Sequence, residues 1–199
     1  MTIQKIEKSH IPTVVKIHKE AFKGFFLTSL GENFLQVYYN AINKNKRGIL
    51  LGYFDNEQLI GFCAATFLSS GFNSYLVKNN ISKFVLIGFR LLFTKPFGLI
   101  RLFKNFTKSN AIFSDKGQYA ELLSIGVDPD FQGRGAGRLL LIALEKELKD
   151  HGANQLSLTT DYCNNDKTLK FYKSLNFEIM YDFVAYPNRR MYRLIKELA

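Results

Sequence analysis

The sequence contains little of what disulfide-rich proteins and metal sites require. Only two of its 199 residues are cysteine, Cys63 and Cys163, and its three histidines are scattered along the chain. This spacing excludes a disulfide framework and predicts no metal site. We therefore expect a protein of the reducing cytoplasm. Residues 1–7 also lack the apolar stretch that a cleavable signal needs.

Long apolar runs are absent as well. The segment Phe84–Phe93 is interrupted by Arg90 and is too short to cross a bilayer, which takes about 20 apolar residues. With 47% hydrophobic and 22% charged residues and no internal repeat, the composition is ordinary for a globular protein. A chain of this length can bury one substantial core. We predict a single domain over 1–199, interrupted by an insertion at about 69–114.

The most informative segment is 121–138, ELLSIGVDPDFQGRGAGR. Leu122–Val127 is an apolar run that stops at Asp128 and Pro129, which predicts a buried strand. A glycine-rich loop follows and opens a predicted helix. Glycines let a backbone approach a ligand closely, and a helix N-terminus presents unpaired N–H groups. With two arginines suited to phosphate oxygens, the loop predicts a pyrophosphate-binding site formed by Gln132, Gly133, Arg134, Gly135, Ala136, Gly137 and Arg138.

The glycine spacing separates this loop from two common phosphate-binding motifs. It lacks the Gly-Lys-Ser/Thr ending of a P-loop, and G-x-G-x-G is not the dinucleotide fingerprint G-x-G-x-x-G. Gln132, Gly135 and Gly137 instead match Gln/Arg-x-x-Gly-x-Gly/Ala. This pattern resembles the signature of the GNAT superfamily of acyl-CoA-dependent N-acetyltransferases. The resemblance implies that acetyl-CoA is the co-substrate.

A second motif strengthens the resemblance. The segment 165–177, NDKTLKFYKSLNF, is similar to N-x-x-A-x-x-x-Y/F-x-x-x-G-F of the same superfamily. It departs at Thr168 and Leu169, where small residues are usual, and at Asn176, where glycine is common; asparagine also tolerates the left-handed conformation that ends a helix. The resemblance implies that Asn165 contacts the pantetheine arm and that Tyr172 lies near the departing sulfur. From the residues alone, a helix N-cap and a packed aromatic remain alternatives.

The order of predicted elements favours a mixed α/β sheet, because hairpins alternate with helical crossovers. We expect strands at 2–7, 48–55, 58–68, 119–127, 155–160, 178–184 and 190–194, and helices at 11–19, 30–43, 136–150 and 165–175. In the helix 136–150 the spacing predicts one apolar face, made of Leu139, Ile142, Ala143 and Leu148.

The resemblance refines this to a GNAT-like fold, with a twisted, partly antiparallel sheet, splayed central strands, flanking helices and a basic helical insertion. The splayed strands would be 119–127 and 155–160. Backbone groups of Ile125, Gly126 and Val127 would then pair with pantetheine amides, as an added strand does.

Glu121 is the predicted general base, and Tyr172 the predicted proton donor to the leaving thiolate. An amine with a pKa of about 10 must lose a proton before it attacks a thioester, and a carboxylate can accept that proton. Histone-acetylating members of the superfamily resemble this chain, with a glutamate at the same distance before the loop. Strand alternation places Glu121 on one face with Leu123 and Ile125. The alternative is a strand-edge carboxylate paired with a nearby Lys or Arg.

Residues 69–114 contain seven basic and nine aromatic residues but no Asp or Glu, in a chain of net charge +10. We predict one or two amphipathic helices there. Three roles remain open: packing on the domain or on the second subunit of a homodimer, recognition of an anionic acceptor, and peripheral attachment to an anionic membrane. Nucleic-acid binding is not expected, because no such motif accompanies the pI of about 9.5.

The segment 21–39 loosely resembles GNAT-like proteins of bacterial surface-glycan assembly. The sequence therefore predicts an N-acetyltransferase that moves an acetyl group from acetyl-CoA to the primary amine of a small anionic acceptor, with a lean towards a nucleotide-linked amino sugar. Two alternatives remain. One is a non-catalytic acyl-CoA-binding or membrane-associated regulatory protein of GNAT fold, and the other an acetyltransferase for peptide or protein amines.

Overall fold

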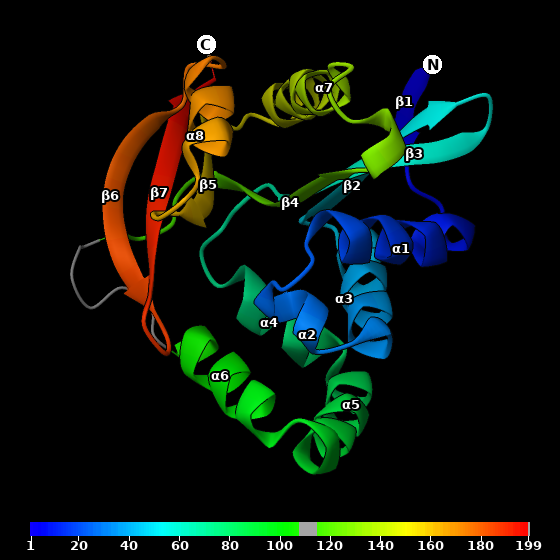
Figure 1. Cartoon of the computed structure of the whole chain (residues 1–199), viewed down its shortest axis with the longest axis vertical. Coiled ribbons are helices and arrows are strands. Elements are labelled where there is room, and N and C mark those ends of the chain that lie inside the picture. Colours follow the sequence, from blue (N-terminus) through cyan, green and yellow to red (C-terminus); the bar gives the residue numbers. More distant parts are fainter. Residues whose placement is uncertain (108–114, 199) are drawn as a thin grey trace.

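The structure is a computed structural model that describes residues 1–107 and 115–198. A seven-stranded sheet runs through the molecule in the order β1-β2-β3-β4-β5-β7-β6 (Figure 1). Only β4 and β5 are parallel among these neighbours, so the predicted mixed sheet is confirmed. The strands are β1 Thr2–Lys5, β2 Gly48–Asp55, β3 Gln58–Thr66, β4 Ala120–Val127, β5 Gln155–Asp161, β6 Glu178–Ala185 and β7 Arg189–Glu197.

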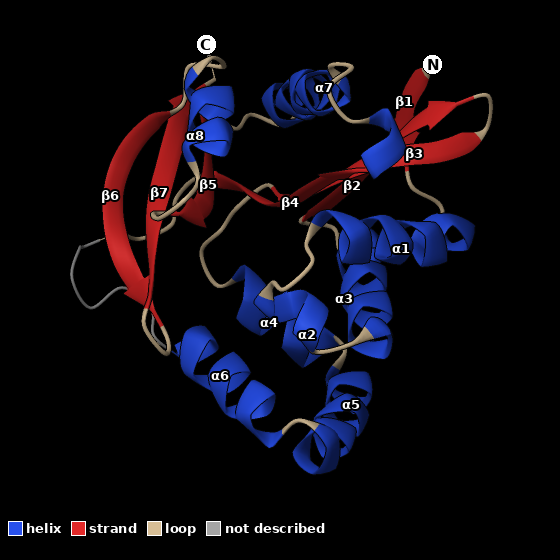
Figure 2. Cartoon of the chain, viewed as in Figure 1, coloured by secondary structure: helices blue, strands red, loops and turns tan. Residues whose placement is uncertain are grey.

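Helices cover both faces of the sheet (Figure 2). One apolar core lies between the sheet and the helices α1 and α3, and a second lies beneath α7 and α8. Successive residues of β3 alternate between the two cores, as the period of a strand requires: Phe62 packs in the first and Cys63 in the second. The helices are α1 Ile11–Ala21, α2 Phe26–Ser29, α3 Glu32–Lys44, α4 Phe72–Asn79, α5 Ile81–Thr94, α6 Pro96–Thr107, α7 Ala136–Asp150 and α8 Asp166–Lys173.

The predicted helix 136–150 is confirmed as α7, but only part of the face that it buries was predicted correctly. Leu139 and Ile142 are 44% and 50% exposed. Leu148 is buried as predicted and Ala143 packs against the core, but the other leucines of the core are Leu140, Leu141 and Leu144. Six consecutive apolar residues, 139–144, allow more than one face of the helix to be buried, so packing against the sheet decided which face it is.

The basic insertion forms three helices, α4, α5 and α6, where one or two were predicted. Residues 108–114 of the predicted insertion lie outside the described residues. Phe72 and Leu76 of α4 are buried in the core of α1 and α3, whereas α5 and α6 form an angled pair at the end of the molecule opposite both termini (Figure 1). In the described ranges, no helix has both the length and the hydropathy to cross a membrane.

The central strands separate, as predicted. β4 and β5 pair over three positions only, from Ala120 opposite Leu156 to Leu122 opposite Leu158. Beyond these positions β4 continues to Val127 and β5 to Asp161, but the two strands no longer pair with each other. The result is a gap between two parallel strands that both still have partners on their outer sides.

A β-bulge in β4 corrects the predicted alternation around Glu121. Opposite consecutive residues of β3 lie Ser124 and Leu122, so Leu123 is the extra residue. Leu123 therefore packs in the core of α1 and α3, and Ile125 in the core of α7 and α8. The prediction that Ile125 shares a face with Leu123 was wrong, because a bulge reverses the alternation beyond it.

Candidate active site

A cavity of about 1200 Å³ begins where β4 and β5 separate. Its walls include the unpaired halves of both strands, residues of α1–α3 and α8, and the inner side of β6 and β7. A drug-sized ligand usually occupies about 300–1000 Å³. This cavity is therefore large enough to bring two reactants together.

The glycine-rich loop forms a smaller hollow of about 320 Å³ at the start of α7. Gly133 and Gly135 have left-handed φ angles of 76° and 83°, and Gly135 is the N-cap residue of α7. A Cβ at either position would meet no atom within 4 Å, so glycine is required here for its backbone conformation rather than for space. Six of the seven predicted pyrophosphate residues line this hollow: Gln132, Gly133, Gly135, Ala136, Gly137 and Arg138.

The seventh, Arg134, does not line either cavity. Its guanidinium carbon lies 5.4 Å from the ring centre of Phe131. The cation–π contact holds the arginine over the turn between β4 and the loop. The role of Arg134 in phosphate binding stays a prediction.

The edge of β4 presents backbone groups to the gap. The N–H of Asp128 donates to the carbonyl of Ile60 in β3, at 2.8 Å. Because backbone groups alternate along a strand, those of Ile125 and Val127 point away from β3 and towards the gap. The Val127 carbonyl accepts a hydrogen bond from Gln132 Nε2 at 3.1 Å, which ties the strand to the loop that follows it.

Helix α8 brings the second predicted motif to the same cavity, which both Asn165 and Tyr172 line. Asn165 precedes α8, but its side chain does not cap the helix. Its amide nitrogen donates to Thr160 Oγ1 at 2.6 Å and to the Asp161 carbonyl at 2.9 Å. Asn165 is therefore the N-cap residue of α8, as the alternative had it, but its side chain bonds to β5 and not to the helix. Asn176 has a φ of 65°, the left-handed conformation predicted for it.

Tyr172 lies between the rings of Phe171 and Phe177, with ring centres 5.2 and 5.5 Å away. Its side chain is almost completely buried, and this burial raises the pKa of its hydroxyl. A tyrosine keeps its proton at neutral pH even at its ordinary pKa of about 10, and burial strengthens this preference. A protonated phenol beside the cavity can donate to a leaving group.

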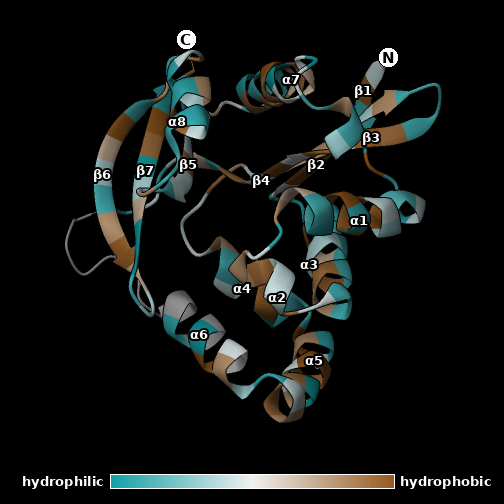
Figure 3. Cartoon of the chain, viewed as in Figure 1, coloured by the Kyte–Doolittle hydropathy of each residue, from teal (hydrophilic) through white to brown (hydrophobic). Residues whose placement is uncertain are grey.

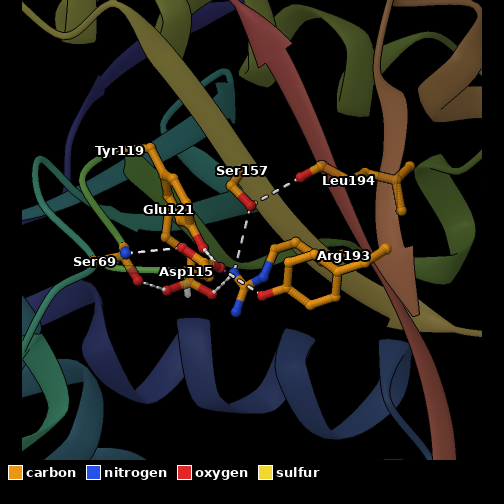
Figure 4. Close-up of polar contacts among 9 residues, drawn as sticks. Ser69, Asp115, Tyr119, Glu121, Ser157, Arg193 and Leu194 are labelled. Carbon is orange, nitrogen blue, oxygen red and sulfur yellow. Dashed lines mark hydrogen bonds and ion pairs between the residues drawn. The ribbon is translucent and has the colours of Figure 1, made fainter. Parts of the chain in front are cut away.

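Glu121 lies where the two strands part, and it is paired (Figure 4). Its Oε1 accepts a hydrogen bond from Arg193 Nη1 of β7 at 2.6 Å, and its Oε2 accepts one from the Ser69 hydroxyl. The side chains of Arg193 and Glu121 are only 13% and 16% exposed. The pairing foreseen as the alternative is thus present, while the role of Glu121 as general base stays a prediction.

Arg193 belongs to a network that sequence reasoning missed. Its guanidinium carbon lies 5.6 Å from the ring centre of Tyr119. The Asp115 carboxylate accepts hydrogen bonds from the hydroxyls of Tyr119 at 2.6 Å and of Tyr181 at 2.5 Å. Although burial raises the pKa of Asp115, these bonds together with Arg193 hold it below its usual value. The network fastens the segment before β4 to β6 and β7, which no local sequence pattern could indicate.

A second missed group is His18 of α1, which lines the cavity and is only 2% exposed. Its Nδ1 lies 2.6 Å from the Tyr39 hydroxyl, which lies 3.0 Å from Ser124 Oγ in the bulge of β4. Burial lowers the pKa of His18 to about 4, so the ring is neutral at pH 7. The sequence carried a signal, because His18 shares the buried helical spacing of Val14 and Ile17.

The far side of the cavity is aromatic and basic. The segment 21–39 contributes four phenylalanines and Tyr38 to its wall, and α6 contributes Arg101. The Arg101 guanidinium carbon lies 4.5 Å from the ring centre of Phe26, and its buried Nε has no hydrogen-bond partner among the described residues. Arg189, by contrast, forms a two-point ion pair with Asp161 at 2.5 Å. In the described ranges no cluster of His, Cys, Asp and Glu could hold a metal ion.

The chain is similar to known acetyltransferases. Residues 11–177 match the acetyltransferase (GNAT) family. The chain is 36% identical over 73 residues to mycothiol acetyltransferase of Thermobifida fusca, an alignment covering 37% of this chain and 22% of that protein. It is 45% identical over 58 residues to [ribosomal protein bS18]-alanine N-acetyltransferase of Salmonella typhimurium, an alignment that covers 29% of this chain and 38% of that protein.

The chain thus spans between 22% and 38% of the length of these curated relatives. Among solved structures, it resembles the protein yncA of Salmonella typhimurium, determined with its cofactor acetyl-CoA, with a TM-score of 0.63. The alignment covers 100% of this chain and 94% of that one at 17% identity. At this level of identity, the likeness concerns the fold alone.

Proposed function

Because this chain belongs to the GNAT family of acetyltransferases, we propose that it transfers an acetyl group from acetyl-CoA to the primary amine of a small anionic acceptor. The observation that carries the proposal is the cavity of about 1200 Å³, which extends from the open edge of β4 to Arg101. A donor thioester and an acceptor amine can meet in this space. The proposal has three parts: the donor site, proton transfer and acceptor recognition.

The donor site fits acetyl-CoA, whose thioester supplies the activated acetyl group. The left-handed glycines and the N–H groups at the start of α7 suit a pyrophosphate. Backbone groups of Ile125 and Val127 face the gap, where an extended pantetheine chain can pair with them. Gly126 and Asn165 line the same cavity.

Proton transfer falls to Glu121 and Tyr172. Glu121 receives the amine proton, directly or through water, because each carboxylate oxygen keeps a lone pair beside the hydrogen bond that it accepts from the protein. Tyr172 stays protonated at neutral pH and donates to the sulfur that leaves. Arg193 orients the Glu121 carboxylate and is a positioning residue.

Acceptor recognition relies on Arg101. A guanidinium with an unpaired, buried Nε suits a carboxylate or phosphate, which it can bind with two parallel hydrogen bonds. The neighbouring phenylalanines of 21–39 offer flat apolar surfaces for stacking. These features support an anionic acceptor with a ring, such as a nucleotide-linked amino sugar.

A second candidate acceptor is the amine of a peptide or protein. The observation in its favour is the similarity to [ribosomal protein bS18]-alanine N-acetyltransferase. An open cavity also suits the end of an extended chain. Arg101 would then bind an acidic side chain or a backbone carbonyl of the substrate.

Release of free thiol from acetyl-CoA tests the proposal with three acceptor panels: nucleotide-linked amino sugars, polyamines and aminoglycosides, and peptide amines. We expect turnover with the first panel. The variant Arg101→Gln should raise KM for the anionic acceptor about tenfold, while Arg90→Gln, which removes an arginine outside the cavity, should leave it unchanged. Calorimetric binding of acetyl-CoA serves as the control.

Preferential turnover of peptide amines would replace the first acceptor by the second. Tight acetyl-CoA binding without turnover on any panel would favour a sensor of acyl-CoA over an enzyme. Failure to bind acetyl-CoA would refute the donor site itself.

A further inference from the structure

Helix α5 and the start of α6 expose many large apolar side chains, with exposed fractions of 47% to 85%. We call this set the α5–α6 apolar face: Ile81, Val85, Leu86, Phe89, Leu92, Phe93, Phe97 and Ile100. Figure 3 shows apolar residues along α5, at the end of the molecule opposite both termini. Single exposed apolar residues are ordinary on protein surfaces, but a continuous set marks an interaction site.

The face is one of three sides of α5. At 3.6 residues per turn, the six residues that α5 contributes to the α5–α6 apolar face fall within an arc of about 140° around the helix axis. On the opposite side, Phe84, Ile87 and Leu91 pack against the core. The basic residues Lys83 and Arg90 lie between these two sides and therefore border the apolar face. The arrangement is typical of helices that lie in the plane of a membrane interface.

We propose that the α5–α6 apolar face docks the protein peripherally on an anionic membrane. The positive charge of this region is the reason for proposing an anionic membrane as its partner. Residues 69–114 contain no Asp or Glu, and neither Lys83 nor Arg90 forms an ion pair with another described residue. Lysine and arginine beside buried apolar residues are attracted to acidic lipid headgroups.

A second copy of this chain fits the face less well. A two-fold contact places the same patch of both subunits opposite one another. Lys83 and Arg90 of both subunits would then border one contact, and the insertion has no carboxylate to neutralise these four positive charges. An anionic bilayer supplies the missing charge and takes up the exposed phenylalanines at once.

Docking would orient the proposed active site. The face lies across the molecule from α7 (Figure 1), so the glycine-rich loop stays turned to the solution. Helix α6, which continues from the face, carries Arg101 into the cavity. The acceptor side of the cavity would thus open beside the headgroups. The docking itself does not rest on the proposed function.

Flotation of the full chain with lipid vesicles tests the proposal. One vesicle population contains phosphatidylcholine alone, and the other contains phosphatidylcholine with phosphatidylglycerol. We expect binding to the second population that weakens with salt. Lys83→Gln with Arg90→Gln should reduce binding about 25-fold, at roughly fivefold for each basic residue. The matched control, Lys146→Gln with Lys149→Gln on exposed positions of α7, should bind as the wild type does.

A second pair of variants tests the apolar part. Phe89→Ser with Phe93→Ser should reduce binding roughly tenfold or more, whereas Ile142→Ser with Ile179→Ser, at exposed positions elsewhere, should not. Circular dichroism verifies that all four variants fold. Equal losses in test and control pairs, or no binding of wild type to anionic vesicles, would overturn the proposal. Wild-type self-association that the two Phe→Ser changes abolish, without vesicle binding, would assign the face to a second copy instead.

Discussion

Lowering the pH from about 7 to about 5 should weaken the fold through one buried side chain, His18. Burial lowers its pKa from 6.5 to about 4. In the unfolded chain the ring has its ordinary pKa and takes up a proton first. The stability that the neutral ring contributes is therefore fully present above the unfolded pKa, and it is lost as the pH falls from 6.5 towards 4.

The pKa change sets the size of the effect. A difference of 2.5 between 6.5 and about 4 corresponds to about 3 kcal/mol over the whole range. Between about pH 7 and about pH 5, the linkage relation gives a loss of about 2 kcal/mol. Of a total stability of roughly 5–15 kcal/mol, this is a large fraction.

Urea unfolding at the two pH values, followed by circular dichroism, measures this loss. The variant His18→Gln keeps a polar group near Tyr39 but cannot take up the proton. It should lose about 2 kcal/mol less than the wild type on acidification. His151→Gln, at an exposed position, should retain the wild-type loss. Equal losses in the wild type and His18→Gln would refute the reasoning.

Three further predictions concern the proposed site. Gly135→Glu should abolish measurable acetyl-CoA binding by calorimetry, because a carboxylate would face the pyrophosphate. The control Gly135→Ala should lower the stability of the fold by only about 1 kcal/mol, because alanine disfavours the left-handed φ. Micromolar affinity in Gly135→Glu would remove the loop from the donor site. Tyr172→Phe should lower kcat about 10²-fold at least and leave acetyl-CoA affinity intact; unchanged turnover and an unchanged pH–rate profile would remove Tyr172 from the mechanism. Glu121→Gln should destabilise the protein by about 3 kcal/mol in urea unfolding, since Arg193 stays buried without its partner. Adding Arg193→Met should recover stability but not turnover, and recovered turnover would show that Glu121 is not the base.

The donor half of the proposed site could be predicted because its parts are neighbours along the chain. The apolar run of β4, the stop at Pro129, the loop and the start of α7 lie within 121–138. Left-handed backbone at Gly133 and Gly135 can be inferred from the glycines themselves, since other residues avoid it. Hairpin, crossover helix and splayed strands then follow from local pattern and from the family resemblance.

The polar network around Glu121 could not be predicted in the same way. Arg193 and Glu121 are 72 residues apart, and Asp115 and Tyr181 are 66 apart. Arg193 reaches Glu121 because β7 pairs with β5 in one register, and a shift of one residue would turn Arg193 to the other face; Tyr181 lies beside Arg193 because β6 pairs with β7. The register of two paired strands cannot be inferred from a single sequence.

The sequence by itself determined the family, the order of the strands and of the helices α1, α3, α7 and α8, and the loop suited to the donor, because these depend on backbone preferences within short segments. Only the tertiary structure decided which face of α7 is buried, where β4 bulges, and that Glu121 is paired with Arg193. These outcomes depend on packing between distant segments, where several local choices have nearly equal free energy. The same holds for α5, whose amphipathic pattern was visible in the sequence, while the fold alone left one apolar side of it exposed.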